Sequence, residues 1–444
     1  MVKFAEVCPT VKPGEGWNNK VGKIKAETTD MHIMIVHQYY LHKDGAGGSR
    51  WNQFAKYWSQ RGHKITVLAG MLEIITAKKY PEYKGKFVVT EYEGSNIVVK
   101  RCHVSEAYNK SFVGRAWAYF SFLVSSIAAG LSVKRPDIVI CTSPPLTVGL
   151  TGVILSKLKR APMIFEVRDL WPESAIDAGV LTNKCLIKFG YWLERFSYRH
   201  AAWINVLTPA FEEVLTNRKG VPAEKISMIP NGADLDIIKP GPRDNWVRQK
   251  HNLNNKFVVT YVGAHGVANA LMQLIEAAKI LKRKDPQVQI VLVGDGMEKP
   301  RLLDAVKKFD LDNVTLIDPV PKSQISDYLS ASDVCTAVLK KCDTFKTVYP
   351  NKVFDYMCAE RPIIIGIDGV ARKLVEDAKA GLYVEPEDPA AFVNAVETIK
   401  TDYENMKNLA VKAREFAVKN FSRISLSEKY LEIIERQKNR EDRH

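Results

Sequence analysis

Residues 350 to 357 read PNKVFDYM, and residues 361 to 366 read RPIIIG. This pattern predicts a helix whose first turn carries Lys352, packed against a buried apolar strand of a parallel sheet. A lysine at a helix N-terminus can take up phosphate charge together with the free backbone amides, and a carboxylate one turn later can accept hydrogen bonds from ribose hydroxyls. We therefore expect Asn351, Lys352 and Asp355 to bind the diphosphate and ribose of a nucleotide.

Strands and helices alternate on both sides of this segment. In the front half the predicted strands are 32–37, 64–69, 87–89, 97–101, 138–141, 163–167, 203–207 and 226–230, with a helix over about 50–61. In the back half they are 257–263, 288–294, 314–317, 334–337 and 362–366. Alternation of this kind is typical of a parallel sheet covered on both faces. The expected fold class is α/β, with two Rossmann-like, doubly wound parallel-sheet domains that face a central cleft.

Three boundaries divide the chain in this interpretation. We expect a flexible N-terminal extension over residues 1–30, which is polar and lacks the apolar run of a signal peptide. A front domain then covers 31–236 and a back domain 237–421, and Lys239-Pro240-Gly241-Pro242 is the best linker candidate. The tail over about 422–440 is amphipathic, so it needs a surface against which to bury its apolar side. That side consists of Leu426, Tyr430, Leu431, Ile433 and Ile434.

The composition is that of an ordinary globular protein, because 46% of the 444 residues are hydrophobic and 26% are charged. The formal net charge is +14, and residues 1–236 supply +10 of it, with 31 Lys and Arg against 21 Asp and Glu. This excess favours a membrane surface or a phosphorylated substrate as partner, and no basic stripe interleaved with aromatic residues indicates nucleic acid. The seven cysteines show no CxxC pair or metal-ligand spacing, so we expect neither a disulfide nor a bound metal.

Residues 116–133 form an uncharged stretch of borderline length for a membrane span. Its serines and glycine weaken the hydrophobicity and a strand follows at once, which favours a helix packed on a sheet, with partial membrane contact as a secondary possibility. The basic front half favours peripheral attachment to the anionic inner face of the plasma membrane, and hence a cytoplasmic location. Candidate contacts are Lys78, Lys79, Lys84, Lys86, Phe112, Arg115 and Trp117.

The first predicted strand is followed by the sequence DGAGGSR at residues 44–50, which opens a helix. Backbone amides in such a turn can meet a phosphate or a sugar hydroxyl, and Gly47 and Gly48 permit close approach. The segment is not a GxGxxG fingerprint, and a plain tight turn explains it as well as a ligand loop does.

Glycine turns also end two strands of the back domain. Gly263, His265 and Gly266 follow the first of them, and Gly294 follows the second. Turn chemistry alone would explain either turn, and a histidine in this setting is more often packed than catalytic. Next to a phosphate, however, His265 could donate a hydrogen bond. Together with Val320, these residues complete the expected donor-binding set.

Residues 165–174 read FEVRDLWPES and place four charged residues and a tryptophan at the exit of an apolar strand. Ligands of α/β proteins bind at such strand ends. Arg168 and Asp169 could orient an acceptor hydroxyl or a departing phosphate, while Trp171 offers a face for sugar stacking and Glu173 completes the acceptor site. The alternative is a structural pair of arginine and carboxylate that caps the strand.

The chain resembles the family 4 glycosyltransferases, which are retaining enzymes of the GT-B fold that use nucleotide sugars. The resemblance extends from about Met31 to the C-terminal helix. It is closest to the group containing L-fucosamine and colanic-acid transferases, through TSPPL at 142–146, EVRDLWPES at 166–174 and IPNGAD at 229–234. It implies a front domain that holds the acceptor, a back domain that holds the donor, a final helix that crosses back to the front domain, and no obligatory metal or other cofactor.

The sequence departs from the family pattern at two places. The second acid of the family's paired-glutamate motif corresponds to Asp355, but Thr347 stands where the first acid belongs. The loop 263–269 also lacks the Arg and Lys of many members, so Lys352 is expected to supply the main positive charge. Arg168 stands where other members place a histidine, and a guanidinium cannot act as a base.

These observations predict transfer of a sugar from a UDP-sugar to a polyprenyl-diphosphate-linked saccharide, with retention at the anomeric carbon. The sugar implied by the resemblance is an N-acetylated hexosamine or a deoxyhexosamine, used in bacterial surface polysaccharide assembly. The expected catalytic residues are Arg168, Asp169, His265 and Lys352. A protein of the same fold that binds nucleotide sugars without transferring them is the alternative.

Overall fold

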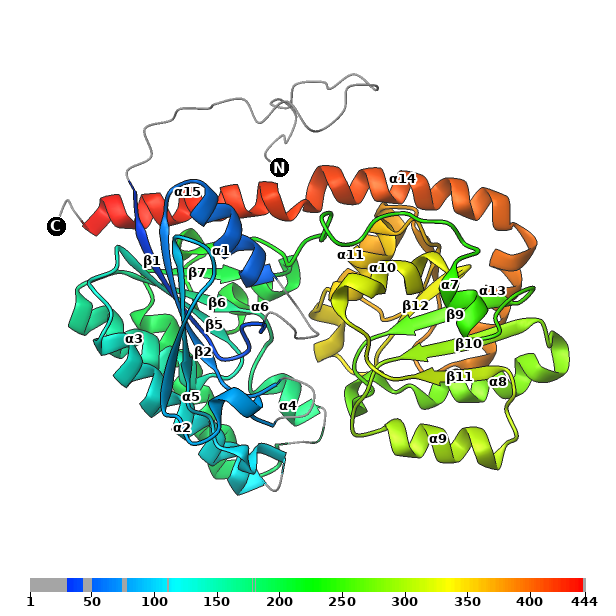
Figure 1. The fold of residues 1–444 in the computed structure, drawn as a ribbon, viewed down its shortest axis with the longest axis horizontal. Coiled ribbons are helices and arrows are strands. Elements are labelled where there is room, and N and C mark those ends of the chain that lie inside the picture. Colours follow the sequence, from blue (N-terminus) through cyan, green and yellow to red (C-terminus); the bar gives the residue numbers. More distant parts are fainter. Residues whose placement is uncertain are drawn as a thin grey trace, which may run out of the picture. The chain divides into compact units, whose positions relative to one another are not determined.

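A computed structural model describes residues 30–42, 50–73, 78–109, 112–177, 179 and 181–441. The expected N-terminal extension, apart from Asp30, lies outside these residues, and so do Gly47 and Gly48. Residues Met31–His444 form one compact unit. The described strands of this unit form two sheets, of eight and of six strands (Figure 1).

The front sheet has the strand order β3-β4-β2-β1-β5-β6-β7-β8. Neighbouring strands are parallel except for β3 and β4, which are antiparallel. The central strands are nearly continuous apolar runs, as expected for strands covered on both faces. The strands are β1 (His32–His37), β2 (Lys64–Gly70), β3 (Val88–Tyr92), β4 (Ile97–Cys102), β5 (Ile138–Ser143), β6 (Met163–Val167), β7 (Trp203–Val206) and β8 (Ile226–Met228).

Helices cover both faces of the front sheet. Helices α2 (Phe112–Leu131), α3 (Thr147–Lys159) and α5 (Lys184–His200) pack on one face. Helices α1 (Arg50–Gln60) and α15 (Arg423–Glu441) pack on the other. The shorter elements of this half are α4 (Glu173–Asp177), α6 (Pro209–Asn217), and the 3-10 helices η1 (Pro81–Tyr83), η2 (Glu106–Asn109) and η3 (Ala223–Lys225).

The rear sheet has the order β11-β10-β9-β12-β13-β14, and all of its neighbouring strands are parallel. Its strands are β9 (Phe257–Val262), β10 (Val288–Val293), β11 (Val314–Ile317), β12 (Val334–Val338), β13 (Ile363–Gly366) and β14 (Gly381–Tyr383). One face packs against α8 (Met272–Lys284), α9 (Lys299–Lys308) and α13 (Pro389–Thr401). The other packs against α11 (Asn351–Cys358), α12 (Val370–Asp377) and α14 (Tyr403–Phe421). The remaining elements are α7 (Trp246–Lys250), α10 (Lys322–Ser330), η4 (Val267–Asn269) and η5 (Thr344–Thr347).

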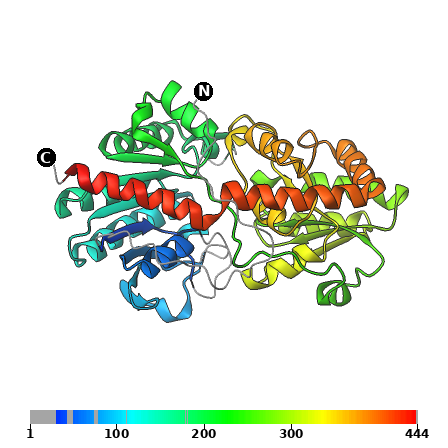
Figure 2. The same cartoon turned by 90° about the horizontal axis from the view of Figure 1, so that it is seen from above.

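The chain passes between the two sheets twice, and the two passages meet. The first runs through the segment after β8, and the second is the junction of α14 and α15, which follow one another from the rear sheet to the front sheet (Figure 2). At the meeting point the Ala233 N–H donates to the Phe421 carbonyl (2.7 Å). Arg423 then donates to the Asn231 carbonyl (3.1 Å) and to Asp234 (2.9 Å). Leu426, Tyr430, Leu431 and Ile434 of α15 are buried on the front sheet, and Ile433 is partly buried there.

The prediction of two doubly wound α/β sheets is confirmed. Most strand ends lie within one or two residues of the predicted ones, but the antiparallel pairing of β3 and the short strand β14 were not predicted. Residues 116–133 lie mostly within α2, which packs on the front sheet through buried Ala118 and Phe122, as the favoured interpretation expected. Among the described residues, no helix combines the length and the apolar character needed to cross a bilayer.

Candidate active site

The carboxyl ends of β9 and β10 form a tight pair of glycine turns. Gly263 and Gly294 have φ angles of 149° and 146°, which an L side chain rarely adopts. The Gly263 N–H donates to the Val293 carbonyl (3.0 Å) and the Gly294 N–H to the Ile317 carbonyl (2.9 Å). A Cβ atom on Gly294 would lie 2.0 Å from the Gly263 carbonyl oxygen. Glycine is therefore required there for the two turns to meet.

Lys352 reaches these turns from the first turn of α11. The helix begins at Asn351, directly after Pro350, as predicted. The Lys352 ammonium lies 3.5 Å from the centroid of the Tyr261 ring, and a Cβ atom on Gly263 would come within 2.7 Å of it. No carboxylate pairs with Lys352 among the residues that the structure describes. Burial without such a partner lowers the pKa of Lys352 to about 7.

His265 lies in the turn after β9 with its ring fully buried. The backbone N–H of His265 donates to the Asp295 carbonyl (2.8 Å), and the ring Nε2 would lie 3.3 Å from a Cβ atom on Gly294. Neither ring nitrogen has a hydrogen-bond partner within the described part of the chain. Burial, with the charges of Lys299 and Lys352, lowers the pKa of His265 to about 4, so the imidazole is neutral near pH 7 and keeps one donor and one acceptor.

Asp355 lies one turn after Lys352 on α11 and is partly buried, with Oδ1 unpaired among the described residues. Burial raises the pKa of its carboxyl, and the nearby charges of Lys322 and Arg423 oppose that change. The helix is held in place by Tyr356, whose hydroxyl donates to the Thr336 carbonyl (3.1 Å) and accepts from the Val262 N–H (3.1 Å). The register of α11 against β9 and β12 thus fixes where the two charged side chains lie.

The other predicted donor residues lie around these turns. Gly266 donates its N–H to the Asn269 side chain (3.3 Å). Val320 packs, partly buried, on an apolar cluster that includes Val293 and Ile317. Asn351 Oδ1 is buried without a partner among the described residues. The structure thus brings Gly263, His265, Gly294 and Lys352 together at the carboxyl edge of the rear sheet, with Asn351 and Asp355 on the same helix as the lysine.

In the front half, Arg168 and Asp169 do not form an ion pair with each other. Arg168 Nη1 lies 3.3 Å from Nε2 of buried His37, while Asp169 accepts a hydrogen bond from the Ser174 hydroxyl (2.9 Å). Burial raises the pKa of Asp169 to about 6. Each side chain is thus held by a separate partner at the exit of β6.

Asp169 and Trp171 line a pocket of about 400 Å³ that residues from both halves of the chain enclose. Five of its fourteen lining residues are aromatic, and we call it the aromatic pocket. The pocket is lined by Gln38, Tyr39, Leu72, Glu73, Tyr108, Arg115, Tyr119, Pro144, Asp169, Trp171, Ser174 and Ala175 from the front half, and by Ala268 and Phe345 from the rear half. Sequence reasoning missed the tyrosines and Phe345, because they come from separate segments and share no local motif.

Glu166 is a structural residue at the centre of a buried network. It forms an ion pair with Arg50 and accepts hydrogen bonds from Trp51 Nε1 (3.2 Å), Thr142 (3.3 Å) and Asn205 (3.1 Å). The alternative interpretation of the 165–174 motif, a structural arginine–carboxylate pair, therefore holds for this one acid. Its partner comes from α1 and not from within the motif.

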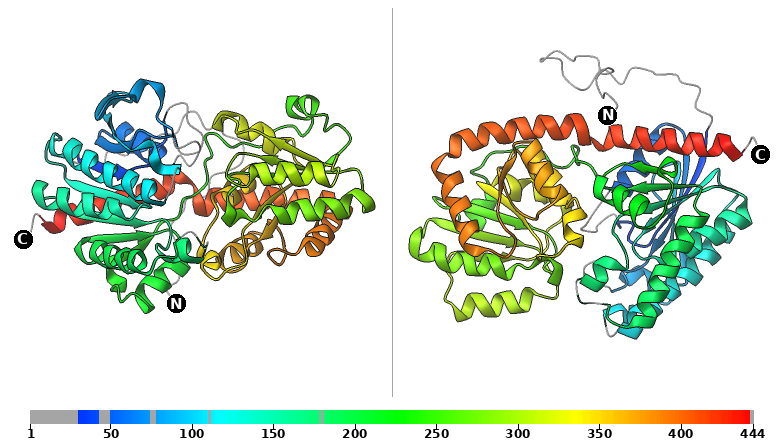
Figure 3. Two further views of the ribbon diagram at one scale, coloured as in Figure 1. Left: turned by 90° about the horizontal axis from the view of Figure 1, so that it is seen from below. Right: turned by 180° about the vertical axis from the view of Figure 1, so that it is seen from behind.

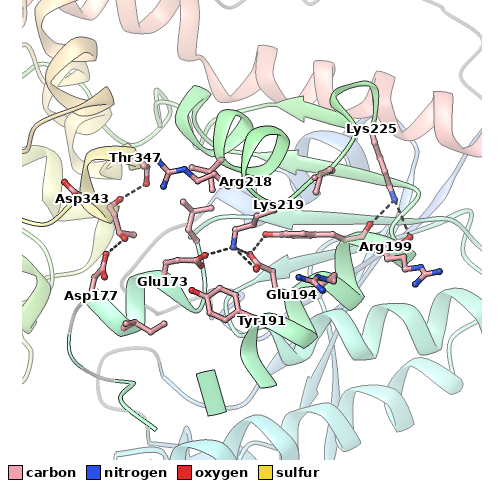
Figure 4. Close-up of a pocket in the computed structure, with 18 of the residues that line it drawn as sticks. Glu173, Asp177, Tyr191, Glu194, Arg199, Arg218, Lys219, Lys225, Asp343 and Thr347 are labelled. Carbon is pink, nitrogen blue, oxygen red and sulfur yellow. Dashed lines mark hydrogen bonds and ion pairs between the residues drawn. The ribbon is translucent and has the colours of Figure 1, made fainter. Parts of the chain in front are cut away.

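Glu173 lies apart from Trp171, in a second and larger cavity of about 1050 Å³. Lys219 lies between Glu173 and Glu194, with its ammonium 2.6 Å from an oxygen of each (Figure 4). Rear-half residues border the same cavity, where Thr344 hydrogen-bonds to Asp177. This placement separates Glu173 from the aromatic pocket that contains Asp169 and Trp171.

Thr347 stands where the family pattern has an acid, and both of its oxygen atoms form hydrogen bonds. Its hydroxyl donates to the Thr344 carbonyl (2.6 Å), and its carbonyl accepts from the Thr208 hydroxyl (2.7 Å). Within the described ranges, no group of three or more His, Cys, Asp or Glu side chains is arranged to hold a metal ion.

Comparisons with known proteins agree with this two-part arrangement. Residues 45–232 match the family model of the glycosyl transferase 4-like domain, and residues 243–416 match the model of glycosyl transferases group 1. The chain thus carries a glycosyl transferase 4-like domain followed by a glycosyl transferases group 1 domain. The match to the narrower group of L-fucosamine and colanic-acid transferases stays a prediction.

Three similar proteins illustrate the range of the match. The α-D-kanosaminyltransferase of Streptomyces kanamyceticus is 26% identical over 236 residues, which are 52% of this chain and 59% of that relative. The probable glycosyltransferase WbjE of Pseudomonas aeruginosa is 23% identical over 388 residues, 83% of this chain and 89% of its own length. The crystal structure of Anabaena HepE in complex with UDP and glucose superposes with a TM-score of 0.69 at 18% identity, over 91% of this chain and 99% of HepE. The chain thus has the GT-B fold.

Proposed function

We propose that this protein is a retaining glycosyltransferase that moves a sugar from a UDP-sugar to a polyprenyl-diphosphate-linked saccharide. The observation that carries the proposal is the convergence of Lys352, His265, Gly263 and Gly294 at the carboxyl edge of the rear sheet. A partly buried lysine without a carboxylate partner is costly, and a bound diphosphate would supply the missing negative charge.

The rest of the proposed donor site follows from its chemistry. The neutral His265 ring can donate one hydrogen bond to a phosphate oxygen, and the start of α11 offers free amides. Asp355 can accept hydrogen bonds from ribose hydroxyls. The solved complex of HepE with UDP and glucose supports UDP as the nucleotide. An N-acetylated hexosamine or a deoxyhexosamine is the sugar that we favour, from the resemblance of the sequence to transferases of such sugars.

The aromatic pocket is the proposed acceptor site. Trp171 and the tyrosines present ring faces on which sugars can stack, and Asp169 can orient an acceptor hydroxyl. Ala268 and Phe345 contribute to its wall from the rear half, so an acceptor bound there would lie next to the turn that carries His265.

In the proposed reaction the acceptor hydroxyl attacks the anomeric carbon on the same face from which the leaving phosphate departs. The acceptor oxygen forms the new glycosidic bond, the bond from the anomeric carbon to the phosphate oxygen breaks, and the β-phosphate takes up the acceptor proton. The protein's contribution is to position both substrates and to stabilise the charge on the phosphate with Lys352 and His265. This route requires neither a metal nor a pair of catalytic carboxylates.

A protein that binds nucleotide sugars without transferring them is the second candidate. The observation that favours it is that Thr347 stands where the family places an acid. Its hydroxyl donates to a backbone carbonyl, and it has no carboxylate with which to contact the donor sugar.

Calorimetry with UDP tests the donor site, with Lys352→Ala as the variant. We expect the substitution to weaken UDP binding at least about tenfold while the melting temperature changes little, because the lysine forms no ion pair in the unliganded site. Equal affinity of variant and wild type would reject the proposed role of Lys352.

Radiolabelled UDP-sugars incubated with membrane lipid extract separate the two candidates. Transfer of label to lipid in the presence of a chelator supports the metal-independent enzyme. UDP binding with neither transfer nor hydrolysis for any donor in the series would favour the binding protein.

A further inference from the structure

The outer side of α2 is an unusual surface for a protein in water. Its exposed large apolar side chains are Val113, Trp117, Phe120, Val124 and Leu131. They recur at the spacing of one helix face, and Trp117 stacks on Phe120 with ring centroids 5.5 Å apart. The opposite side of the helix is already buried in the front core. The exposed stripe is therefore not needed to hold α2 on the sheet.

The neighbouring helices extend this stripe. Ile154 and Leu158 are exposed on α3, and Phe189, Tyr191 and Trp192 are exposed on α5. With the α2 residues they make up ten of the nineteen exposed large hydrophobic side chains in the described part of the chain. Figure 3 shows the three helices together on the side of the front sheet away from α15. We call this surface the α2–α3–α5 face.

The charges of the α2–α3–α5 face have one sign. Lys157 on α3 and Lys184, Lys188 and Arg195 on α5 are exposed. The described residues of the three helices include a single carboxylate, Glu194, which is buried and paired with Lys219. An exposed apolar stripe on helices whose exposed charges are all positive complements an anionic bilayer, whereas a protein partner would have to offer a carboxylate to each of these cations.

We propose that the α2–α3–α5 face binds the surface of an anionic membrane. Trp117, Phe120, Phe189 and Trp192 enter the boundary between headgroups and acyl chains, where aromatic rings are favoured, and the lysines and arginines contact lipid phosphates. The inference deepens the proposed function, and rests on it in so far as the acceptor is a lipid.

This assignment differs from the contacts predicted from sequence. Of those, Phe112, Arg115 and Trp117 belong to α2, but the lysines precede or follow η1 and lie off these helices. Lys79 also contacts His103 at 2.8 Å. The exposed aromatic residues of α5 escaped prediction because their exposure depends on which side of the helix meets the sheet.

The proposed orientation also determines where the larger cavity lies relative to the membrane. Tyr191, Arg195 and Arg199 belong to α5 and line that cavity as well. With the α2–α3–α5 face on a membrane, this edge of the cavity lies at the level of the lipid headgroups.

The test is flotation of the full chain with vesicles of phosphatidylglycerol and phosphatidylcholine, compared with vesicles of phosphatidylcholine alone. We expect binding to the anionic vesicles, a decrease of at least about tenfold for the double variant Trp117→Ser, Trp192→Ser, and a clear decrease for Lys188→Glu. Matched controls are Trp246→Ser, on an exposed tryptophan of the rear half, and Lys412→Glu, on an exposed lysine of α14. Both controls should bind as the wild type does.

Several results would overturn the proposal. Wild-type binding no stronger to anionic than to neutral vesicles would do so, as would equal losses in the control variants. Conversion of a wild-type dimer to a monomer by the tryptophan substitutions would assign the face to a protein interface. UDP affinity, measured on every variant, should not change, and the melting temperature of each variant shows that it is folded under the conditions of the assay. A chain that binds vesicles through this face but transfers no sugar would count against the proposed function and leave the membrane surface standing.

Discussion

The protonation of Lys352 makes a quantitative prediction about nucleotide binding. Its pKa of about 7 in the unliganded protein means that about half of the molecules carry the ammonium at pH 7 and about 1% at pH 9. A bound diphosphate favours the charged form and raises the pKa of the lysine in the complex. Affinity for UDP should therefore fall as the pH rises through 7. Between pH 7 and 9 the expected loss is about 50-fold, or about 2.3 kcal/mol, if the lysine stays charged in the complex.

Isothermal titration calorimetry at pH 7, 8 and 9, in buffers of different ionisation enthalpy, measures both the affinity and the protons taken up. We expect uptake of about half a proton per UDP at pH 7, rising to about one at pH 9. The range begins at pH 7 because phosphate groups themselves titrate near pH 6.

Two variants separate Lys352 from other titrating groups. Lys352→Met should bind UDP weakly and with little dependence on pH. Lys400→Met is the control, because Lys400 pairs with Asp285 just before β10, at the amino edge of the sheet, and this variant should keep the wild-type dependence. A flat affinity from pH 7 to 9 in the wild type, or an unchanged slope in Lys352→Met, would refute the reasoning.

Three further substitutions test the structure. Gly294→Ala puts a methyl group against the Gly263 carbonyl, so UDP binding should fall more than about tenfold and thermal denaturation should show a loss of about 1–3 kcal/mol; an unchanged protein would contradict the turn geometry. Glu166→Gln leaves the Arg50 charge buried without its partner, so urea unfolding should show a loss of about 3–5 kcal/mol, and a loss below about 1 kcal/mol would contradict the central role of the network. Arg423→Ala removes contacts at the start of α15, so its amides should exchange faster with deuterium while those of β9 do not; unchanged exchange in α15 would argue against this anchor.

Local patterns were sufficient to predict most of the strands and the start of α11. The start of α11 at Asn351 follows from the proline before it, and the near-continuous apolar runs of β9 and β10 mark buried parallel strands. The turn glycines could be assigned to strand ends because each follows such a run directly. These features depend on residues that are close in sequence.

Long-range pairings could not be predicted from spacing. Glu166 was one of four charged residues in a single motif, and its structural role became visible only once α1 had brought Arg50 to it from 116 residues away. The separation of Glu173 from Trp171 likewise depends on Lys219, which comes from beyond α6. The aromatic pocket is lined by side chains from several separate segments, so no single segment of the sequence predicts it.

The position of α15 sets the order in which the chain can finish folding. Tyr430 contacts Trp51, Phe54 and Trp58 with ring centroids 5.5 to 6.0 Å apart, so the aromatic surface of α1 is covered by residues near the far end of the chain. Although the front half leaves the ribosome first, its outer apolar layer stays open to water until α15 (Arg423–Glu441) has been synthesised. The half that begins first is therefore completed only when α15 docks, and removal of α15 would open a core that includes Trp51, Phe54 and Trp58.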